Sequence, residues 1–257
     1  MKFSFLMAVN RDNPYLDAAI KSVLNQTDPD FEFFIVANNC SDELWNYLNS
    51  FADARLRLFR TRIGQLSFNL NYGLNKIGTG YALRMDADDI SIPERLALTK
   101  QALVENNYPD ILAGSAMIID QNSARTGTVT VPLAHDEIVR KLWYKNPIVH
   151  PACALRVESI LKIRGYSGGF LSEDYELWIR AARADAIRFT GIASQLIEYR
   201  VHGDQARGQT LAYAEAAGVR VREFVLNRDI KFLFGALYST SKYFYRSIVS
   251  SFVRKAS

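Results

Sequence analysis

Residues 81–96 read YALRMDADDISIPERL, in which a short apolar run leads directly into three carboxylates. The apolar residues predict a buried strand, and Pro93 predicts the start of an amphipathic helix after the acidic turn. Packing does not account for Asp86, Asp88 and Asp89, because like charges repel and burying a charge is costly. A divalent cation would relieve that repulsion, and oxygen ligands suit Mg²⁺ or Mn²⁺. The segment therefore indicates a metal site that holds a phosphorylated ligand.

Three other interpretations of this acidic turn compete with a metal site. The plainest is a solvated turn with a helix-capping aspartate, which the turn alone leaves open. A calcium-binding EF loop needs Gly at its sixth position and Glu at its twelfth, where this chain has Ser91 and Ala97. A phosphatase-type Asp-x-Asp nucleophile is expected after the first strand of its fold, whereas this run follows several strand and helix signals. The last two interpretations do not fit.

Composition indicates a globular protein with an uneven charge. The 257 residues suffice for one large α/β domain or two closely joined halves, and 49% of them are hydrophobic against 23% charged. The formal net charge is +4, yet residues 228–257 hold six Lys or Arg against Asp229 alone. The rest of the chain is therefore close to neutral, which argues against a nucleic-acid-binding face on the main body.

The cysteines and the apolar runs predict a cytoplasmic protein. Cys40 and Cys153 lie far apart without metal-ligand spacing, as expected for free thiols in a reducing compartment. The apolar run at residues 3–9 is too short for a signal peptide, and no run is long enough to cross a bilayer.

Strand and helix signals alternate through the first 119 residues. Strands are expected at 2–9, 31–37, 55–59, 81–85 and 111–119, with helices between them at 14–25, 41–51, 66–77 and 92–106. This alternation predicts an α/β fold with a mostly parallel sheet and helices on both faces. In such sheets ligands bind at the carboxyl ends of the strands, where Asn10, Asn38 and the acidic turn fall.

The pattern is looser after residue 119. It predicts strands at 126–131, 152–155 and 195–201, and helices at 135–144, 173–184 and 211–227, with Ser172 as a cap of the second helix. Residues 230–253 interleave aromatic and apolar side chains with basic ones, which predicts an interfacial helix on anionic lipid. A helix that packs on its own domain or on a dimer partner is the alternative.

Several separated motifs occur in one order along residues 3–205. They are FLMAV at 5–9, EFFIV at 32–36, NYGL at 71–74, DADDISIPERL at 86–96, EDYELW at 173–178 and YRVH at 199–202. Together they resemble a family-two glycosyltransferase of the GT-A fold. The resemblance implies a Rossmann-like nucleotide-binding half at 1–119, a smaller acceptor-binding half at 120–205 and a helical extension at 206–257.

The resemblance also implies an inverting, metal-dependent transfer from a nucleotide-diphosphate sugar to a hydroxyl of a saccharide or lipid-linked acceptor, in surface polysaccharide biosynthesis. Asp88 is then the first ligand of Mn²⁺ or Mg²⁺, with Asp86 and His202 as further ligands and Asp89 in a supporting role. The tail would place the protein at the inner face of the cell membrane. Contacts to the donor are expected from Ala8, Asn10, Asn38, Asn71, Arg84 and Asp86.

By the same resemblance, Asp174 matches the general base that takes the proton of the acceptor hydroxyl. Glu173 lies beside it, to orient the acceptor or raise the pKa of the base. Both residues have a plainer interpretation, since acidic residues in the first turn of a helix complement its dipole. Trp178 is better explained as a core residue than as a sugar platform, and His202 is equally well explained as a structural residue after a strand.

The turn after the second strand departs from the family. Two acidic residues are usual there, and this chain has Asn38 and Asn39. The Asn38 carbonyl can accept a hydrogen bond from a pyrimidine imide N–H, but its amide can also donate. A uridine diphosphate sugar remains the expected donor. Arg84 can pair with the acidic turn or reach a phosphate.

Two other functions fit the sequence less well. A sugar nucleotidyltransferase is expected to have a glycine-rich basic loop after its first strand. Residues 8–15 of this chain contain no Gly, and Arg11 is their one basic residue. A catalytically degenerate module that binds carbohydrate or a partner would be signalled by loss of Asp88 or Asp174, and both are present.

Overall fold

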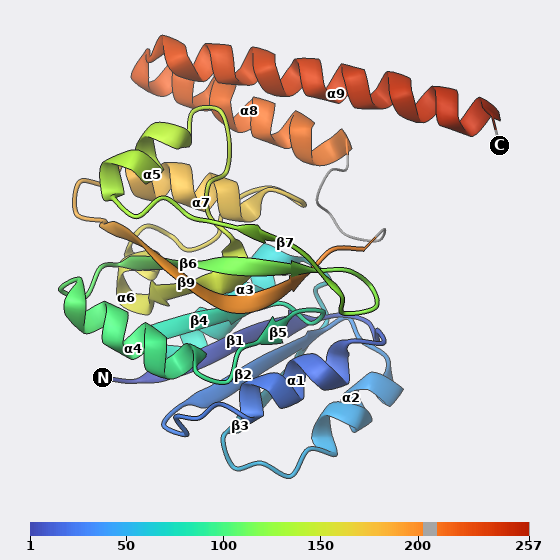
Figure 1. Cartoon of the computed structure of the whole chain (residues 1–257), viewed down its shortest axis with the longest axis vertical. Helices are drawn as coiled ribbons and strands as arrows, with labels where there is room; N and C mark the ends of the chain where they lie inside the picture. Colours follow the sequence, from blue (N-terminus) through green and yellow to red (C-terminus); the bar gives the residue numbers. More distant parts are fainter. Residues whose placement is uncertain (203–209, 257) are drawn as a thin grey trace.

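The computed structural model describes residues 1–202 and 210–256, with side chains described up to residue 245. Figure 1 shows a central sheet with helices on both faces, and the last two helices, α8 (Thr210–Asn227) and α9 (Ile230–Ala256), lying together beyond one of those layers. This confirms the predicted α/β class and the helical C-terminal extension. The expected boundary at 205–206 falls outside the described residues.

Four strands from the first part of the chain form the parallel half of the sheet. They lie in the order β3-β2-β1-β4, and each neighbouring pair is parallel. The central residues of β1 and β2 are apolar on both faces, as buried parallel strands require, whereas the edge strand β3 exposes Arg57 and Arg60. The carboxyl ends of β1, β2 and β4 therefore meet at one edge of the sheet. Their bounds are β1 (Phe3–Val9), β2 (Glu32–Asn38), β3 (Leu56–Thr61) and β4 (Tyr81–Met85).

The other half of the sheet is mixed. β8 runs antiparallel to both β4 and β6, β9 runs parallel to β6, and β5 and β7 add antiparallel pairs to β9 and β6. One sheet thus continues through both of the expected halves, because β8 pairs directly with β4. The bounds are β5 (Ile90–Ser91), β6 (Ile111–Ile119), β7 (Arg125–Val129), β8 (Cys153–Arg156) and β9 (Phe189–Arg200).

Helices bury their apolar sides on the two faces of the sheet. Phe5 and Met7 of β1 pack with α1, α2 and α4, whereas Leu6 points to the opposite face and packs with α3, α5, α6 and α7. Trp178 of α7 is fully buried in that second core, as predicted. The helices are α1 (Leu16–Leu24), α2 (Asp42–Asn49), α3 (Leu66–Ile77), α4 (Arg95–Glu105), α5 (His135–Lys141), η1 (His150–Ala152), α6 (Val157–Lys162) and α7 (Glu173–Ala182).

Most predicted elements are confirmed, and the differences lie around the acidic turn, at the unpredicted helix α6, and at β9, which begins at Phe189 and not at residue 195. Pro93 does not open α4, which begins at Arg95. The Pro93 carbonyl instead accepts a hydrogen bond from the Thr27 N–H at 2.9 Å, and the preceding Ile90–Ser91 pair as β5 with β9. A two-residue strand and the short helix α6 give too little periodicity to detect in a sequence.

The cysteines agree with one further expectation. Cys40 and Cys153 are both free thiols. Among the helices of the described residues, none is both long and apolar enough to cross a membrane.

Helix α9 packs closely against the body at Gly235. A Cβ atom there would lie 1.9 Å from the Trp143 carbonyl oxygen and 2.9 Å from Cδ of Arg220. Ala236 and Ser239, on the same side of the helix, are only 4% and 3% exposed. The first part of the extension therefore packs on its own domain, which was the alternative to a free interfacial helix.

Replacing this glycine tests whether that contact stabilises the fold. Gly235→Ala forces α9 away from a backbone carbonyl, so we expect it to lower the free energy of unfolding by about 1–3 kcal/mol. Gly218→Ala is the matched control, because nothing lies within 4 Å of a Cβ there. That change should raise stability by about 0.5–1 kcal/mol, since glycine disfavours helix interiors. Urea denaturation measures both, and equal effects of the two substitutions would contradict the contact.

Candidate active site

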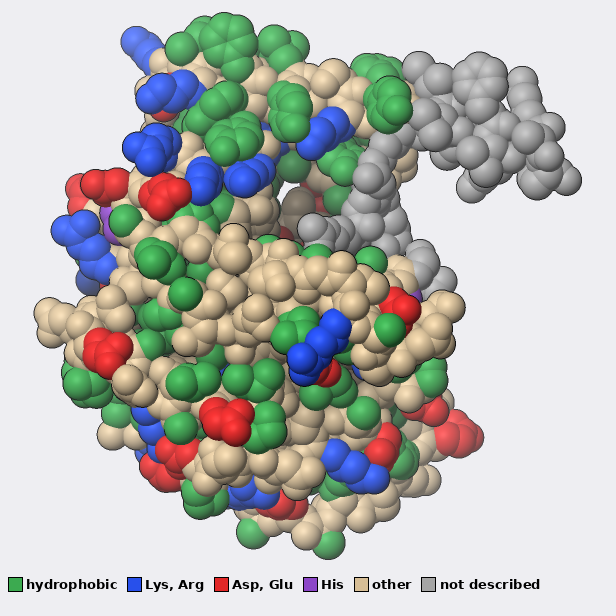
Figure 2. Space-filling model, in the orientation of Figure 1, with side chains coloured by type: hydrophobic (Ala, Val, Ile, Leu, Met, Phe, Trp, Pro, Cys, Tyr) green, Lys and Arg blue, Asp and Glu red, His purple; other side chains and the backbone are tan. Residues whose placement is uncertain are grey.

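A cavity of about 840 Å³ opens at the carboxyl edge of the parallel strands. The ends of β1, β2 and β4 form one wall, the start of α7 and the loop 144–151 form another, and α8 and α9 close the far end. Figure 2 shows a hollow between the C-terminal helices and the body, with Lys and Arg side chains gathered on the helical side. The predicted site residues that line the cavity are Ala8, Asn10, Asn38, Arg84, Asp86, Asp88, Glu173, Asp174 and His202.

The acidic turn is held together by a different partner for each carboxylate. Asp86 forms an ion pair with the buried guanidinium of Arg84. Asp89 is fully buried and accepts a hydrogen bond from the Arg200 N–H at 2.8 Å. Burial raises the pKa of both Asp86 and Asp89, and the neighbouring carboxylates add to it. Asp89 therefore joins the turn to β9, and Asp86 and Asp88 are the two that line the cavity.

Asp88 and His202 come together from residues far apart in the chain. The Asp88 Oδ2 and His202 Nε2 atoms are 3.0 Å apart. In the described part of the chain, no group of three or more His, Cys, Asp or Glu side chains is arranged to hold a metal ion. The chemistry of this pair fits a cation that takes one or two ligands from the protein and the others from a bound phosphate, as Mg²⁺ and Mn²⁺ do.

Asn38 presents an oriented amide at the end of β2. It is 5% exposed, and its Nδ2 donates to the Val9 carbonyl at 3.0 Å and to the Val36 carbonyl at 3.4 Å. Because both bonds use the amide nitrogen, the amide oxygen is the atom left to accept from a ligand. The side chain thereby acts as an acceptor at a position where the resembling family usually has a carboxylate.

The sequence predicts a donor contact from Asn71, but this residue does not line the cavity. Its Nδ2 donates to the Tyr166 carbonyl at 2.7 Å, and its Oδ1 accepts from the Tyr166 N–H at 2.8 Å. Gly165 makes room for this contact, since a Cβ there would lie 2.1 Å from Oδ1 of Asn71. Both polar groups of the side chain thus bind backbone, and Asn71 joins α3 to the loop before α7.

Glu173 and Asp174 lie at the start of α7 and differ in their hydrogen bonds. Asp174 accepts from its neighbour's N–H, that of Tyr175, at 2.6 Å and from Asn146 Nδ2 at 2.7 Å. Burial raises the pKa of Asp174, and these two bonds oppose the shift. Burial, followed by the charge of Asp174, raises the pKa of Glu173 to about 8. Burial and the neighbouring charge thus favour the protonated form of Glu173, whereas its hydrogen bonds favour the ionised form of Asp174, which makes Asp174 the more available proton acceptor of the two.

A carboxylate from α8 holds the loop that leads into this pair. Glu215 accepts hydrogen bonds from the N–H groups of Phe170 and Leu171, at 2.8 and 3.0 Å, and from Ser172 Oγ at 2.9 Å. Ser172 consequently makes no capping bond to α7, contrary to the sequence prediction. Sequence reasoning missed Glu215, since a single Glu inside a predicted helix carries no signal of a partner in a distant loop.

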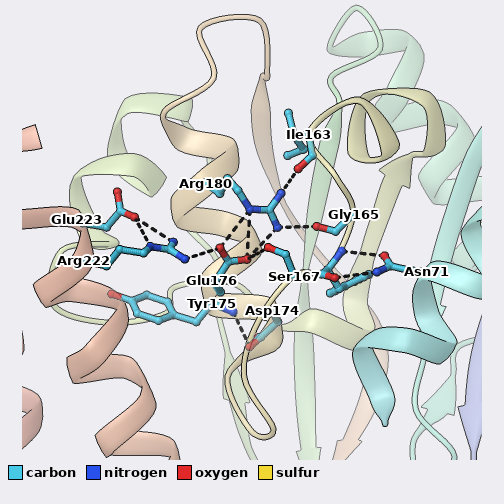
Figure 3. Close-up of polar contacts among 11 residues, drawn as sticks. Asn71, Ile163, Gly165, Ser167, Asp174, Tyr175, Glu176, Arg180, Arg222 and Glu223 are labelled. Atoms are coloured by element: carbon cyan, nitrogen blue, oxygen red, sulfur yellow. Dashed lines mark hydrogen bonds and ion pairs between the residues drawn. The ribbon is translucent and has the colours of Figure 1, made fainter. Parts of the chain in front are cut away.

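Buried ion pairs continue this link between α7 and α8. Figure 3 shows Glu176 of α7 between Arg180 of its own helix and Arg222 of α8, at 2.8 and 2.9 Å. Glu223 is fully buried and pairs with Arg222 at 3.0 Å and with Arg183 at 3.3 Å. The helix that carries the carboxylate pair is thus fixed to the C-terminal helices by charged contacts.

His150 lines the cavity but is a structural residue. Its Nε2 lies 2.7 Å from the Tyr166 hydroxyl, and its ring contacts Trp178 edge to face. Burial lowers the pKa of His150 well below its usual value, so the imidazole is neutral.

Residues 5–164 match the protein-family model described as Glycosyl transferase family 2. Over 245 residues the chain is 36% identical to the O-antigen biosynthesis glycosyltransferase WbnJ of Escherichia coli, covering 93% of this chain and 95% of that protein. The chain therefore belongs to glycosyltransferase family 2, and it is a glycosyltransferase.

Two further comparisons agree with that family. A UDP-Gal:alpha-D-GlcNAc-diphosphoundecaprenol beta-1,3-galactosyltransferase of Escherichia coli is 26% identical over 274 residues, covering 98% of each chain. The crystal structure of S. aureus TarS 1-349 in complex with UDP-GlcNAc aligns with a TM-score of 0.69 at 16% identity, over 91% of this chain and 69% of that one. The similarity to this crystal structure shows that the chain has a GT-A fold.

The raised pKa of Glu173 predicts how stability depends on pH. Its carboxyl has a pKa of about 8 when folded against a usual value of 4.5, so its contribution is fully present below pH 4.5 and is lost as pH rises toward 8. Glu173→Gln removes this titration. The Tm of the variant minus that of the wild type should grow between pH 5 and pH 8, by about 2 °C or more. Calorimetry measures it, and a constant or shrinking difference would contradict the assignment.

Proposed function

We propose that this glycosyltransferase moves a sugar from a uridine diphosphate donor to a hydroxyl group of a saccharide or lipid-linked acceptor, with inversion at the anomeric carbon. One observation carries the proposal. A single cavity is lined both by Asp88 and His202 and by Glu173 and Asp174. These are the two acidic centres that such a transfer needs, one for the leaving diphosphate and one for the acceptor proton.

Asp88 and His202, with Asp86 beside them, would hold the divalent cation, Mn²⁺ or Mg²⁺. The cation would neutralise the charge that grows on the leaving diphosphate. The chain's own part is to keep these donors in place. Arg200 contributes by donating from Nε to the Asp88 carbonyl at 2.8 Å and through its backbone N–H to Asp89. Both bonds fix the turn that carries the ligands.

Asn38 supports uracil as the donor base. Its amide oxygen is the atom left to accept a hydrogen bond, which suits the imide N–H of uracil. Ala8 and Asn10, which line the same part of the cavity at the end of β1, would contact the nucleotide from the neighbouring strand. Arg84 would act mainly through its ion pair with Asp86.

Asp174 would act as the general base. Hydrogen bonds from Asn146 and from the Tyr175 N–H favour its ionised form, whereas the raised pKa of Glu173 keeps that neighbour protonated. A protonated Glu173 can donate to the acceptor sugar beside the base. Direct displacement with one base inverts the anomeric configuration, so an α-linked donor would give a β-linked product.

The relatives support a role in surface polysaccharide biosynthesis. The names of two of them give O-antigen biosynthesis and transfer of galactose to a sugar on diphosphoundecaprenol. A degenerate binding module is disfavoured, because Asp88 and Asp174 are both present and share a cavity. A sugar nucleotidyltransferase is disfavoured by the absence of glycine from residues 8–15.

Two substitutions separate donor binding from chemistry. Asp88→Asn should weaken UDP binding in the presence of Mn²⁺ by about tenfold or more, because it removes a proposed ligand of the cation. Asp174→Asn should leave that binding intact and lower kcat by about 10²- to 10⁴-fold, the usual contribution of a general base. Isothermal titration with UDP, with and without Mn²⁺, and transfer assays with a panel of nucleotide sugars measure the two effects.

Asp185→Asn is the matched control, since Asp185 is exposed beyond the end of α7 and does not line the cavity. It should change neither quantity. Full transfer activity in Asp174→Asn would show that Asp174 is not the base. UDP binding of equal affinity with and without Mn²⁺ would contradict a metal-dependent donor site.

We also propose that α9 contacts an anionic membrane surface. Apolar side chains recur at helical spacing along it and are exposed, with Phe234 and Leu237 each at 59%. Lys231 and Lys242 flank them, and such a combination is typical of helices that lie on anionic lipid. The stripe consists of Ile230, Phe234, Leu237, Phe244 and Tyr245.

Cosedimentation with vesicles of phosphatidylglycerol and phosphatidylcholine tests this contact. Replacing Phe234 and Leu237 together by serine should lower vesicle affinity by about tenfold, because two buried apolar side chains are lost. Val104→Ser is the control, since Val104 is 62% exposed on α4 and far from the stripe in sequence. Unchanged vesicle binding by the double variant would refute membrane contact through α9.

A further inference from the structure

The far end of the cavity carries positive charge that the described residues do not neutralise. Arg220 of α8, Lys242 of α9 and Lys145 of the loop after α5 all line it. None of the three has a carboxylate within ion-pair distance in the described parts of the chain. This differs from the end formed by the acidic turn, where the lining Arg84 is paired with Asp86.

Arg220 gives the strongest evidence for an anion site among the three, because its side chain is only 3% exposed. Its Nε donates to the Tyr175 hydroxyl at 2.7 Å, and its Nη1 donates to the Gly235 carbonyl and to Ser239 Oγ. All of these acceptors are neutral. No described group accepts from Nη2. A buried guanidinium without a counter-charge is costly, so an anion at this position would stabilise the site.

The buried carboxylates nearby do not supply that charge. Glu176 is engaged by Arg180 and Arg222, and Glu223 by Arg222 and Arg183. Glu215 of α8 is engaged as well, by N–H groups of the loop before α7, so none of these three carboxylates pairs with Arg220. Figure 3 shows Tyr175 and Asp174 beside Glu176 and its two Arg partners. Because Arg220 binds the Tyr175 hydroxyl, its charge lies next to the helix start that carries the proposed base.

We propose that this end of the cavity binds a phosphate or diphosphate group of the acceptor, through Arg220 and Lys242 with Lys145 at the rim. The inference rests on the proposed function, since it concerns the acceptor of that reaction. Tyr175 connects the two parts of the site: its N–H binds Asp174 and its hydroxyl binds Arg220. The base and the guanidinium are thus joined through one tyrosine, with a hydrogen bond at each end. An acceptor sugar can thus present its hydroxyl to Asp174 while its phosphate contacts Arg220.

The aromatic residues at this end fit a sugar phosphate better than a free anion. Tyr144, Tyr213 and Tyr238 also line the cavity there. The Lys242 Nζ atom lies 4.4 Å from the Tyr238 ring centroid, so the cation and an apolar face are presented together. Sugar rings pack on such faces, and phosphates accept charge-assisted hydrogen bonds from the neighbouring Lys and Arg.

Titration of the full chain with hexyl diphosphate in EDTA tests the site. The chelator removes metal, so binding at the donor end, which the proposed function makes metal-dependent, does not contribute. Hexyl diphosphate should bind the wild type, and Lys242→Gln and Arg220→Gln should each lower its affinity by about tenfold. Hexanol, which lacks the anion, should not bind measurably.

Lys231→Gln is the control, since Lys231 lies on α9 outside the cavity. It should not alter the affinity for hexyl diphosphate. Because Lys242 is exposed, Lys242→Gln should fold normally, so it tests the site even if Arg220→Gln does not fold. No binding in EDTA, or equal binding by all variants, would overturn the proposal. A third outcome would also overturn it: both Lys242→Gln and Lys231→Gln weaken binding to anionic vesicles, while neither changes the affinity for hexyl diphosphate. UDP titration with Mn²⁺ reports separately on the donor site.

Discussion

Three carboxylates within four residues repel one another, and the rest of the site depends on how the chain holds them together. Asp86 pairs with Arg84 from the same strand, Asp88 lies against His202, and Asp89 is anchored by the backbone of Arg200. Two of these three partners come from the end of β9, more than 100 residues later in the sequence. The mixed half of the sheet therefore helps to form this end of the cavity, because pairing with β6 and β5 brings β9 to the acidic turn.

A second constraint acts on the carboxylates at the start of α7. This helix is fixed to α8 by Glu215, which binds the preceding loop, and by the buried pairs of Glu176 with Arg180 and Arg222. Removing one partner from such a buried network leaves an uncompensated charge, which is more costly than losing a surface ion pair. Helix α8 is thus part of the wall of the candidate site, because it fixes the helix that carries Glu173 and Asp174.

The sequence predicts the parallel half of the fold well, since clear patterns and end signals mark α3 and β4, whose bounds agree with the prediction. Boundaries fail where tertiary contacts replace local ones. Pro93 binds Thr27 through its carbonyl before α4 begins, and Ser172 bonds to Glu215 where a cap was expected.

The same reason explains the residues of the site. Motif residues such as Asp88, Asp174 and His202 are brought to the cavity, whereas Asn71 lies in a motif but binds the backbone of Tyr166. Glu215, Asn146 and Arg220 belong to no motif, so only the folded chain brings them to α7. Local pattern identifies residues that carry chemistry, and the long-range contacts that orient them need the structure.

The family match ends at residue 164, before α7, α8 and α9. It spans β1, β2 and β4 and the acidic turn, and it leaves out the helices that close the far end of the cavity. If donor and acceptor bind at opposite ends as proposed, the part of the chain that the family shares determines activation of the nucleotide sugar. The last third of the polypeptide then determines which recipient glycans are accepted. Chimeras joined near that position would then exchange one property and retain the other.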